Sequence, residues 1–285
     1  MKCVGLNSRE KISNVFVYVI LVVMSVLWIV PIVWVVLTSF RAEQGALVSN
    51  FFPETFTFDN YKRLFTDTTI FNFPQWFWNT FWVASVSCVL TTVMNLTTAY
   101  VISRLRFRLR RTFMNIALVL GMFPAFMSMI AVYYVLKSIN LTHNLWALVI
   151  VYSASAGLQF YVAKGFFDTI PRSLDESAKL DGANNAQIFW KIILPLSKPI
   201  VVYTALTAFM APWMDFIFSK IIMGTEYDKY TVAVGLFTML DKENIDSCFT
   251  LFAAGSVCIA VPITILFIVM QRFYVDGITG GAVKG

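Results

Sequence analysis

The sequence contains few of the residues that carry most enzymatic and metal chemistry. Among its 285 residues there is one histidine, His143, and charged side chains make up only 13%. The four cysteines, Cys3, Cys88, Cys248 and Cys258, are scattered without metal-ligand spacing, and no G-x-x-x-x-G-K-[ST] loop is present to hold phosphates. We therefore expect no metal site, no nucleotide site and no cofactor bound by this chain. A membrane enzyme is disfavoured because it would need clustered acids, bases or metal ligands.

The scarcity of charge is matched by an excess of apolar residues in long runs. Hydrophobic residues make up 58% of the chain and the mean hydropathy is +0.72, which is too apolar for a soluble domain of this length. A helix needs about 20 apolar residues to cross a hydrocarbon core of roughly 30 Å. The candidate spans lie near Val15–Phe40, Gln75–Ser103, Phe113–Leu136, Leu145–Ala163, Ile200–Phe218 and Cys248–Gln271. They predict an all-α polytopic membrane protein with six transmembrane helices in a single domain, 1–285. A membrane barrel would need short alternating segments that the sequence lacks.

Lysine and arginine are distributed unevenly between the segments that connect these spans. Fifteen of the 22 basic residues lie before the first span or after the second, fourth and sixth. Because positive charge is retained on the cytoplasmic side, both termini, the segment 166–199 and the tail 272–285 are expected in the cytoplasm. The connections 41–75 and 222–247 are then extracellular. The arginine-rich run Arg104–Arg111 is explained as an anchor against translocation, and anionic membrane lipid accounts for the net charge of +6 without a nucleic-acid partner.

A charged stretch that begins at Ser173 interrupts the apolar runs on the cytoplasmic side. Ser173 and Glu176 have the spacing of a capping box, which predicts the start of a helix. Gly182 can end that helix in a left-handed conformation, and a second helical run, Gln187–Leu194, is expected to be closed by Pro195. The pattern predicts a helix-Gly-helix hairpin that projects from the membrane and needs a partner.

The residue order of this hairpin carries a family resemblance. It contains Glu176, Ser177, Ala178, Asp181, Gly182, Ala183, Ile192, Leu194 and Pro195. This order resembles the "EAA" loop of the permeases of binding-protein-dependent ABC importers, with Ser177 where the family usually has a second alanine. In that family the membrane subunit grips its ATPase through this loop, so the resemblance implies an ATPase-coupling role for these residues.

The glycine-rich end of the chain is similar to the same family. It contains Gly277, Thr279, Gly280, Gly281 and Lys284. This pattern resembles the C-terminus of maltose-type permeases that pair with a larger sister subunit, which implies that the tail runs into the ATPase dimer and couples to it. From Asp276 onward there is little apolar surface to fix a conformation, so we expect the tail to be ordered only in the assembled complex.

Two outer segments also resemble the family. The segment Phe51–Tyr61 reads F-x-P-x-x-F-T-x-x-N-Y, an opening common in sugar-importer permeases. It is expected either to lie on the outer headgroups, where aromatic rings are stable, or to contact a partner. The segment Tyr230–Gly235 looks like the family's loop that inserts into the solute-binding protein.

The resemblance covers nearly the whole chain and implies a type I ABC importer permease fold in a bacterial cytoplasmic membrane. The implied partners are a sister permease, two ATPase subunits that use ATP and Mg, and an extracellular solute-binding protein. The implied cargo is an oligosaccharide, of the malto-oligosaccharide type. An ion-coupled secondary transporter, or a permease for another sugar or polyol, is the alternative, although a secondary transporter predicts more charge within its spans.

The fifth predicted span contains the clearest candidates for a translocation path. Trp213 and Asp215 follow Pro212, and a carboxylate at membrane depth usually faces a cavity or a partner. The open alternative is that Asp215 lies near the outer interface and pairs with Lys220 or solvent. Asn95 belongs to a polar strip on the second span, which either packs against a neighbouring helix or contributes to the path.

Overall fold

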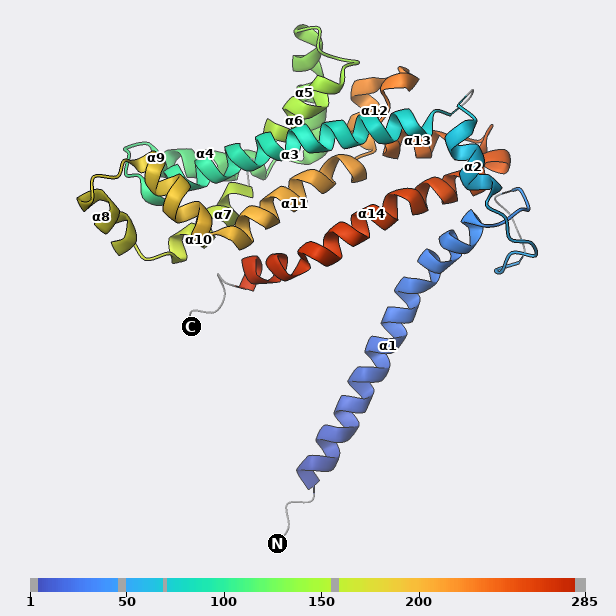
Figure 1. Cartoon of the computed structure of the whole chain (residues 1–285), viewed down its shortest axis with the longest axis horizontal. Helices are drawn as coiled ribbons and strands as arrows, with labels where there is room; N and C mark the ends of the chain where they lie inside the picture. The colour runs from blue at the N-terminus through green and yellow to red at the C-terminus, as the bar shows by residue number, and fades with distance from the viewer. Residues whose placement is uncertain (1–4, 46–49, 69–70, 155–158, 280–285) are drawn as a thin grey trace. The chain divides into compact units, whose positions relative to one another are not determined.

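The computed structural model of the chain is built from helices (Figure 1), which confirms the all-α prediction. It describes residues 5–45, 50–68, 71–154 and 159–279. In chain order the elements are α1 (Gly5–Ser39), α2 (Asp59–Thr66), α3 (Phe73–Arg104), α4 (Arg110–Gly121), α5 (Ala125–Ser138), α6 (Leu145–Ala154), α7 (Gln159–Thr169), α8 (Ser173–Leu180), α9 (Asn185–Ile188), the π-helical η2 (Phe189–Ile193), α10 (Leu194–Leu196), α11 (Lys198–Met214), α12 (Ile217–Met223), the 3₁₀-helical η3 (Tyr227–Lys229), α13 (Val232–Thr238) and α14 (Ile245–Thr279).

Within the part of the chain that the structure describes, three helical segments are long and apolar enough to cross a membrane on their own. They are Asn14–Ser39 within α1, α3, and Ile245–Gln271 within α14. Three further candidates are bent pairs: α4 with α5 at 103°, α6 with α7 at 43°, and Asn185–Leu196 with α11 at 87°. The number of spans reaches the predicted six if each bent pair counts as one.

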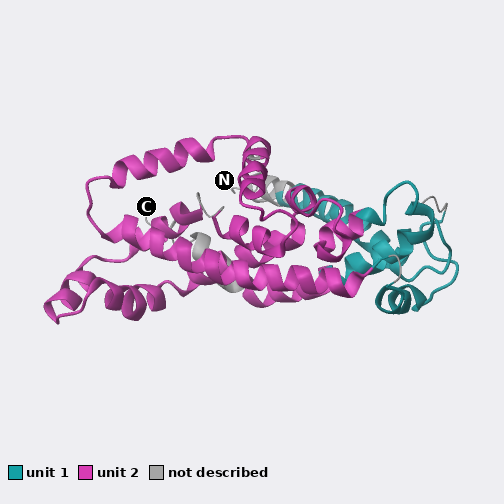
Figure 2. Ribbon diagram, turned by 90° about the horizontal axis from the view of Figure 1, so that it is seen from above, with its two compact units in different colours: residues 1–71, 238–259 teal, residues 72–237, 260–285 magenta. Residues whose placement is uncertain are grey.

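The chain divides into two compact units, coloured separately in Figure 2. The smaller unit comprises residues 1–71 and 238–259, and the larger unit comprises residues 72–237 and 260–285. Each unit has its own internal organisation.

The larger unit is organised around α3. Helices α11, α7 and α6 each pack along α3, and Figure 1 shows α11 running beside it. Small residues such as Ala84 and Ala99 are fully buried on α3, which allows neighbouring helices to approach closely. The thiol of Cys88 donates to the carbonyl of Ala205 on α11 at 3.2 Å. Helix α3 is therefore the scaffold on which the candidate sites are placed.

The start of α3 holds the segment that resembles the binding-protein loop. Trp76 Nε1 donates to the carbonyl of Tyr227 at 2.9 Å, and Asn79 Nδ2 donates to the carbonyl of Tyr230 at 3.0 Å. The fully buried side chains of the segment are those of Tyr230, Thr231, Val232 and Val234. The preceding stretch, residues 225–229, is exposed.

The smaller unit ties the end of α1 to α2. The side chain of Asn60 donates to the carbonyls of Ser39 at 3.1 Å and Arg41 at 2.7 Å, and the hydroxyl of Tyr61 hydrogen-bonds to Ser39 Oγ at 2.7 Å. The Asn-Tyr pair of the aromatic outer segment is therefore structural. The exposed rings of the aromatic segment, such as that of Phe52, remain available to the lipid headgroups or to a partner.

Candidate coupling site and polar cavity

The first helix of the predicted hairpin is α8. It begins at Ser173, but no side chain caps its first turn, and Arg172 before it already has helical backbone angles. The predicted capping box between Ser173 and Glu176 is therefore wrong. The chain enters α8 through a turn at Pro171, whose fixed φ suits a helix start, and this places Ser173 inside the helix.

Gly182 makes the turn of the hairpin, as predicted. Its φ is +86°, and the N–H of the following Ala183 donates to the carbonyl of Ala178 at 2.9 Å, which closes the end of α8. A Cβ built at Gly182 would meet no atom within 4 Å. The requirement for glycine therefore comes from the backbone angle alone.

The capping box of the hairpin lies at the start of its second helix. Asn184 Oδ1 accepts from the N–H of Gln187 and Gln187 Oε1 accepts from the N–H of Asn184, both at 2.9 Å. The Asn-x-x-Gln spacing is the sequence signal that could have located it. The helix continues to Leu196, so the predicted closure at Pro195 is also wrong. The π-helical η2 widens the turn before Pro195, which accommodates a ring that would clash in a regular helix.

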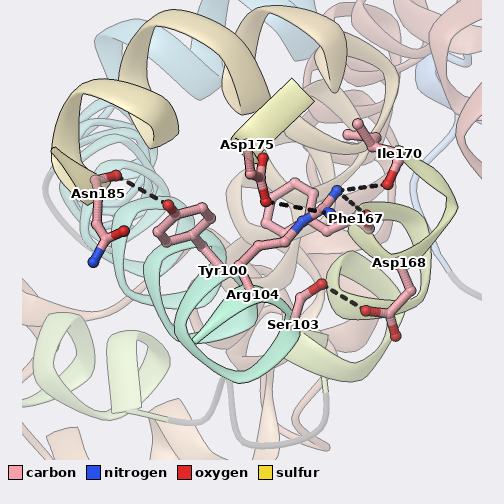
Figure 3. A network of polar contacts seen from close by, with 8 residues as sticks. All are labelled: Tyr100, Ser103, Arg104, Phe167, Asp168, Ile170, Asp175 and Asn185. Carbon is pink, nitrogen blue, oxygen red and sulfur yellow. Dashed lines mark hydrogen bonds and ion pairs between the residues drawn. The ribbon is translucent and has the colours of Figure 1, made fainter. Parts of the chain in front are cut away.

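A buried arginine holds the hairpin to the end of α3 (Figure 3). The side chain of Arg104, the last residue of α3, is 3% exposed. Nη2 donates to the carbonyls of Phe167 at 2.7 Å and Ile170 at 2.9 Å, and Nη1 forms an ion pair of 3.4 Å with Asp175 of α8. A planar guanidinium directs its donors along fixed directions, so one side chain joins α3, the end of α7 and α8.

Two further hydrogen bonds join α3 to its neighbours here, one to α7 and one to the second helix of the hairpin (Figure 3). Ser103 Oγ donates to Asp168 Oδ1 at 2.6 Å, and the hydroxyl of Tyr100 donates to the carbonyl of Asn185 at 3.0 Å. Apolar residues of both hairpin helices join the same buried cluster as α3 and α7, among them Ala178, Ile188, Phe189 and Ile193. The hairpin is thus a fixed extension of the larger unit.

The predicted coupling residues divide into an inner and an outer set. Ala178 is buried, and Ala183, Ile192 and Leu194 are partly buried against the apolar cluster. The exposed set is Glu176, Ser177, Asp181, Gly182 and Pro195. Sequence reasoning missed Leu180, which is 90% exposed at the end of α8. It adds an apolar side chain to the exposed set. Its signal in the sequence was an apolar residue directly before the Asp-Gly turn.

A cavity of about 780 Å³ lies within the larger unit. Its polar lining is formed by Asn95, Thr98, Ser128, Tyr152, Ser153 and Asp215, and its aromatic lining by Phe113, Phe123, Phe160 and Phe218. Two of the three residues predicted for the translocation path, Asn95 and Asp215, therefore line one cavity although they are far apart in sequence.

Asp215 lies where the fifth predicted span breaks. It follows the last residue of α11 with an extended backbone, ψ 109°, and its Oδ1 accepts from the N–H of Phe218 at 3.1 Å, within the first turn of α12. Oδ2 accepts from the hydroxyl of Tyr152 at 2.6 Å and from Ser219 Oγ at 3.4 Å. The carboxylate thus joins α6 to the start of α12 beside the cavity.

The structure does not pair Asp215 with Lys220. The ammonium of Lys220 donates to the hydroxyl of Tyr230 at 2.6 Å. Pro212 lies inside α11, so the helix breaks after Met214 and not at the proline.

Asn95 and Trp213 have different surroundings. Asn95 is 1% exposed; its Nδ2 donates to Gln159 Oε1 at 3.3 Å, whereas its buried Oδ1 has no hydrogen-bond partner. Trp213 is 7% exposed and packs against the rings of Phe77 and Phe209, with centroids 5.1 and 6.0 Å away. Trp213 is therefore placed in an aromatic cluster, and Asn95 beside the cavity.

The structure describes only part of the predicted tail. Gly277 and Thr279 belong to α14, whereas Gly280, Gly281 and Lys284 lie outside the described residues. The expectation of a tail without structure from Asp276 onward is wrong as far as Thr279. Extending an existing helix adds a hydrogen bond per residue without a new nucleation step, and this outweighs the weak helix propensity of glycine.

Apolar helices, a polar cavity among them and a charged hairpin fixed to one end of the scaffold helix together define a helical membrane permease. The family model described as "Binding-protein-dependent transport system inner membrane component" matches residues 95–276. The chain belongs to this family of inner-membrane permease subunits.

Relatives of known assignment match the chain over nearly all of its length. It is 34% identical to the galactooligosaccharides transport system permease protein GanQ of Bacillus subtilis, covering 97% of this chain and 98% of that protein. It is also 34% identical to the maltodextrin transport system permease protein MalD of Streptococcus pneumoniae, covering 99% of both. The maltose/maltodextrin permease MalG of Escherichia coli K12 is 32% identical over 90% of each chain.

A solved structure supports the predicted fold. A chain of a bacterial ABC transporter involved in the import of the acidic polysaccharide alginate superposes with a TM-score of 0.81 at 24% identity. The match covers 93% of this chain and 98% of that one. This likeness, with the family membership, confirms the importer-permease fold.

Proposed function

We propose that this chain is one of two permease subunits of an ATP-driven importer for an oligosaccharide, of the malto-oligosaccharide type. An extracellular solute-binding protein delivers the sugar, and two separate ATPase subunits hydrolyse ATP with Mg. The chain itself binds no nucleotide, cofactor or metal in this proposal. The relatives named for galactooligosaccharide and maltodextrin transport, at 34% identity over almost the whole chain, support this class of sugar.

The observation that carries the transport mechanism is the attachment of the hairpin to α3. A loop that merely connected two spans would not need an arginine whose side chain is 3% exposed and is joined to three partners. The ATPase docks on the exposed face of the hairpin, where Leu180 lies near Glu176 and Asp181. Movement of the ATPase is then passed through Asp175 and Arg104 to α3.

Uptake by the reconstituted complex tests this function. Vesicles that contain this chain, its sister permease and the ATPase, supplied with the solute-binding protein, are expected to accumulate labelled maltotriose or a galacto-oligosaccharide only when ATP is present. Uptake driven by a proton or sodium gradient without ATP would identify the secondary-transporter alternative. Failure to take up any oligosaccharide would contradict the proposed cargo.

A further inference from the structure

We propose that the cavity beside Asn95 and Asp215 binds one segment of an uncharged oligosaccharide during its passage, and that it rejects acidic saccharides. This inference rests on the proposed function and adds to it a location within this chain and a charge selectivity. The site is formed by α3, α6 and the break between α11 and α12, together with apolar walls from α4 and α5.

The size and the polar groups of the cavity fit a small-molecule ligand. Its volume of about 780 Å³ lies within the range of about 300–1,000 Å³ that is usual for such sites. The Oδ1 atom of Asn95 is buried, faces no protein donor, and belongs to a side chain that is 1% exposed. A buried acceptor without a donor is costly, and a sugar hydroxyl supplies the missing hydrogen bond.

The remaining polar groups can each exchange a hydrogen bond with a hydroxyl. Thr98 and Ser128 present hydroxyls to the cavity, and Asp215 accepts hydrogen bonds from Tyr152 and Ser219 while also lining the cavity. A carboxylate has about four acceptor positions, so these bonds leave Asp215 able to accept another.

The charge of the cavity sets its selectivity. Among the described residues that line it, Asp215 is the one charged side chain, and no lysine, arginine or histidine is present to neutralise an anion. A saccharide that carries carboxylates would meet the like charge of Asp215, which is unfavourable. A neutral sugar has no such conflict. Its apolar ring faces can pack on the rings of Phe113, Phe160 and Phe218.

Protection of an introduced thiol tests the site directly. In the complete complex, with the four native cysteines replaced by serine, Thr98→Cys places a thiol in the cavity and Thr97→Cys places one at the neighbouring position outside its lining. Maltotriose at about ten times its Kd is expected to slow the labelling of Thr98→Cys by a small water-soluble reagent about tenfold. Labelling is measured both without nucleotide and with nucleotide bound. Labelling of Thr97→Cys should not change, and an oligo-uronate of the same length should protect neither position.

The charge selectivity has its own variant. Asp215→Asn keeps a side-chain oxygen for the N–H of Phe218 but removes the negative charge, so it should let the oligo-uronate protect Thr98→Cys. Uptake of maltotriose is measured in the same vesicles. If maltotriose is taken up but does not protect Thr98→Cys, or if the thiol at this position never reacts with the reagent, the inference is overturned while the proposed function stands. Absence of uptake by the parent complex contradicts the proposed function itself.

Discussion

Arg104 shows how much of the proposed coupling depends on a single side chain. In the sequence it belongs to an arginine-rich run that a positive-inside argument explains completely. The structure separates it from that run, because its guanidinium is buried and reaches the carbonyls of Phe167 and Ile170 and the carboxylate of Asp175. Hydropathy and charge counts report which side of a membrane a residue lies on, but they carry no information on whether it is buried against another element.

Arg104→Ala should loosen the hairpin while leaving the spans inserted. The substitution leaves the buried carboxylate of Asp175 unpaired, which costs about 3 kcal/mol. Amide hydrogen exchange in α8 is expected to rise by about a hundredfold and ATP-driven uptake to fall. Arg104→Lys keeps the charge without the forked geometry and should be intermediate. The matched control is Arg108→Ala, an exposed position in the same basic run; an equal effect there would contradict the assignment.

Glu43 gives the outer loop a dependence on pH. Its pKa is lowered because the carboxylate accepts from its own backbone N–H, and further from those of Thr55 and Glu54, the last two at 3.0 Å. A pKa that is lower in the folded state means that the stabilisation is present above the unfolded pKa of about 4.3 and is lost as the pH falls through the folded value. The protection factors of the amides of residues 54 and 55, which are corrected for the intrinsic pH dependence of exchange, should therefore fall at acid pH. In Glu43→Gln that pH dependence should vanish.

The hairpin shows which local signals predict an element and which do not. The Gly182 turn was predictable because a positive φ strongly favours glycine, and this preference depends little on the surrounding structure. The helix starts and ends were not. Ser173-x-x-Glu176 and Asn184-x-x-Gln187 have equivalent spacing, and the chain path through Pro171 decides that only the second is used. Pro195 is a helix breaker in sequence, but a π-helical turn accommodates it here.

Gly182→Val tests whether the hairpin depends on the left-handed backbone conformation of this turn. The backbone angle is unfavourable for a β-branched residue by about 1–2 kcal/mol, while the space around the position is open, so the effect should come from the turn alone. ATPase coupling is expected to fall with normal membrane insertion. Gly182→Asn, which tolerates this conformation, should retain most activity. Gly165→Ala in α7 is a matched control, because that glycine also has open space but no positive φ.

At the scale of the whole chain, hydropathy predicted the apolar helices but not how they are interrupted. Among the described residues, three helical segments are long and apolar enough to span alone, and three bent pairs are further candidates. The predicted fifth span is also interrupted near its end, because α11 stops before Asp215. The carboxylate of Asp215 accepts hydrogen bonds from Tyr152, which is far away in sequence, and from Ser219 of α12. For the same reason the sequence could nominate Asn95 and Asp215 separately but could not show that they share a cavity.

The tail is proposed to couple to the ATPase dimer through Gly277, Thr279, Gly280, Gly281 and Lys284. Deletion of residues 279–285 should leave insertion unchanged, because the candidate span in α14 ends at Gln271. The expected result is a weaker association with the ATPase or hydrolysis without uptake, measured by co-purification and by the ratio of ATP hydrolysed to sugar accumulated. Full-rate transport by the truncated complex would show that the tail has no coupling role.

Helix α3 is bonded at both of its ends. Trp76 and Asn79 hold the segment that begins at Tyr227, and Arg104 holds the hairpin. Its 32 residues form an unbroken rod of about 48 Å. A rod clamped in this way behaves as a lever: a tilt imposed by the ATPase at one end displaces the opposite end without any change in the helix itself. Spin labels at its two ends should therefore keep a constant separation through the transport cycle, while each changes its distance to the sister permease.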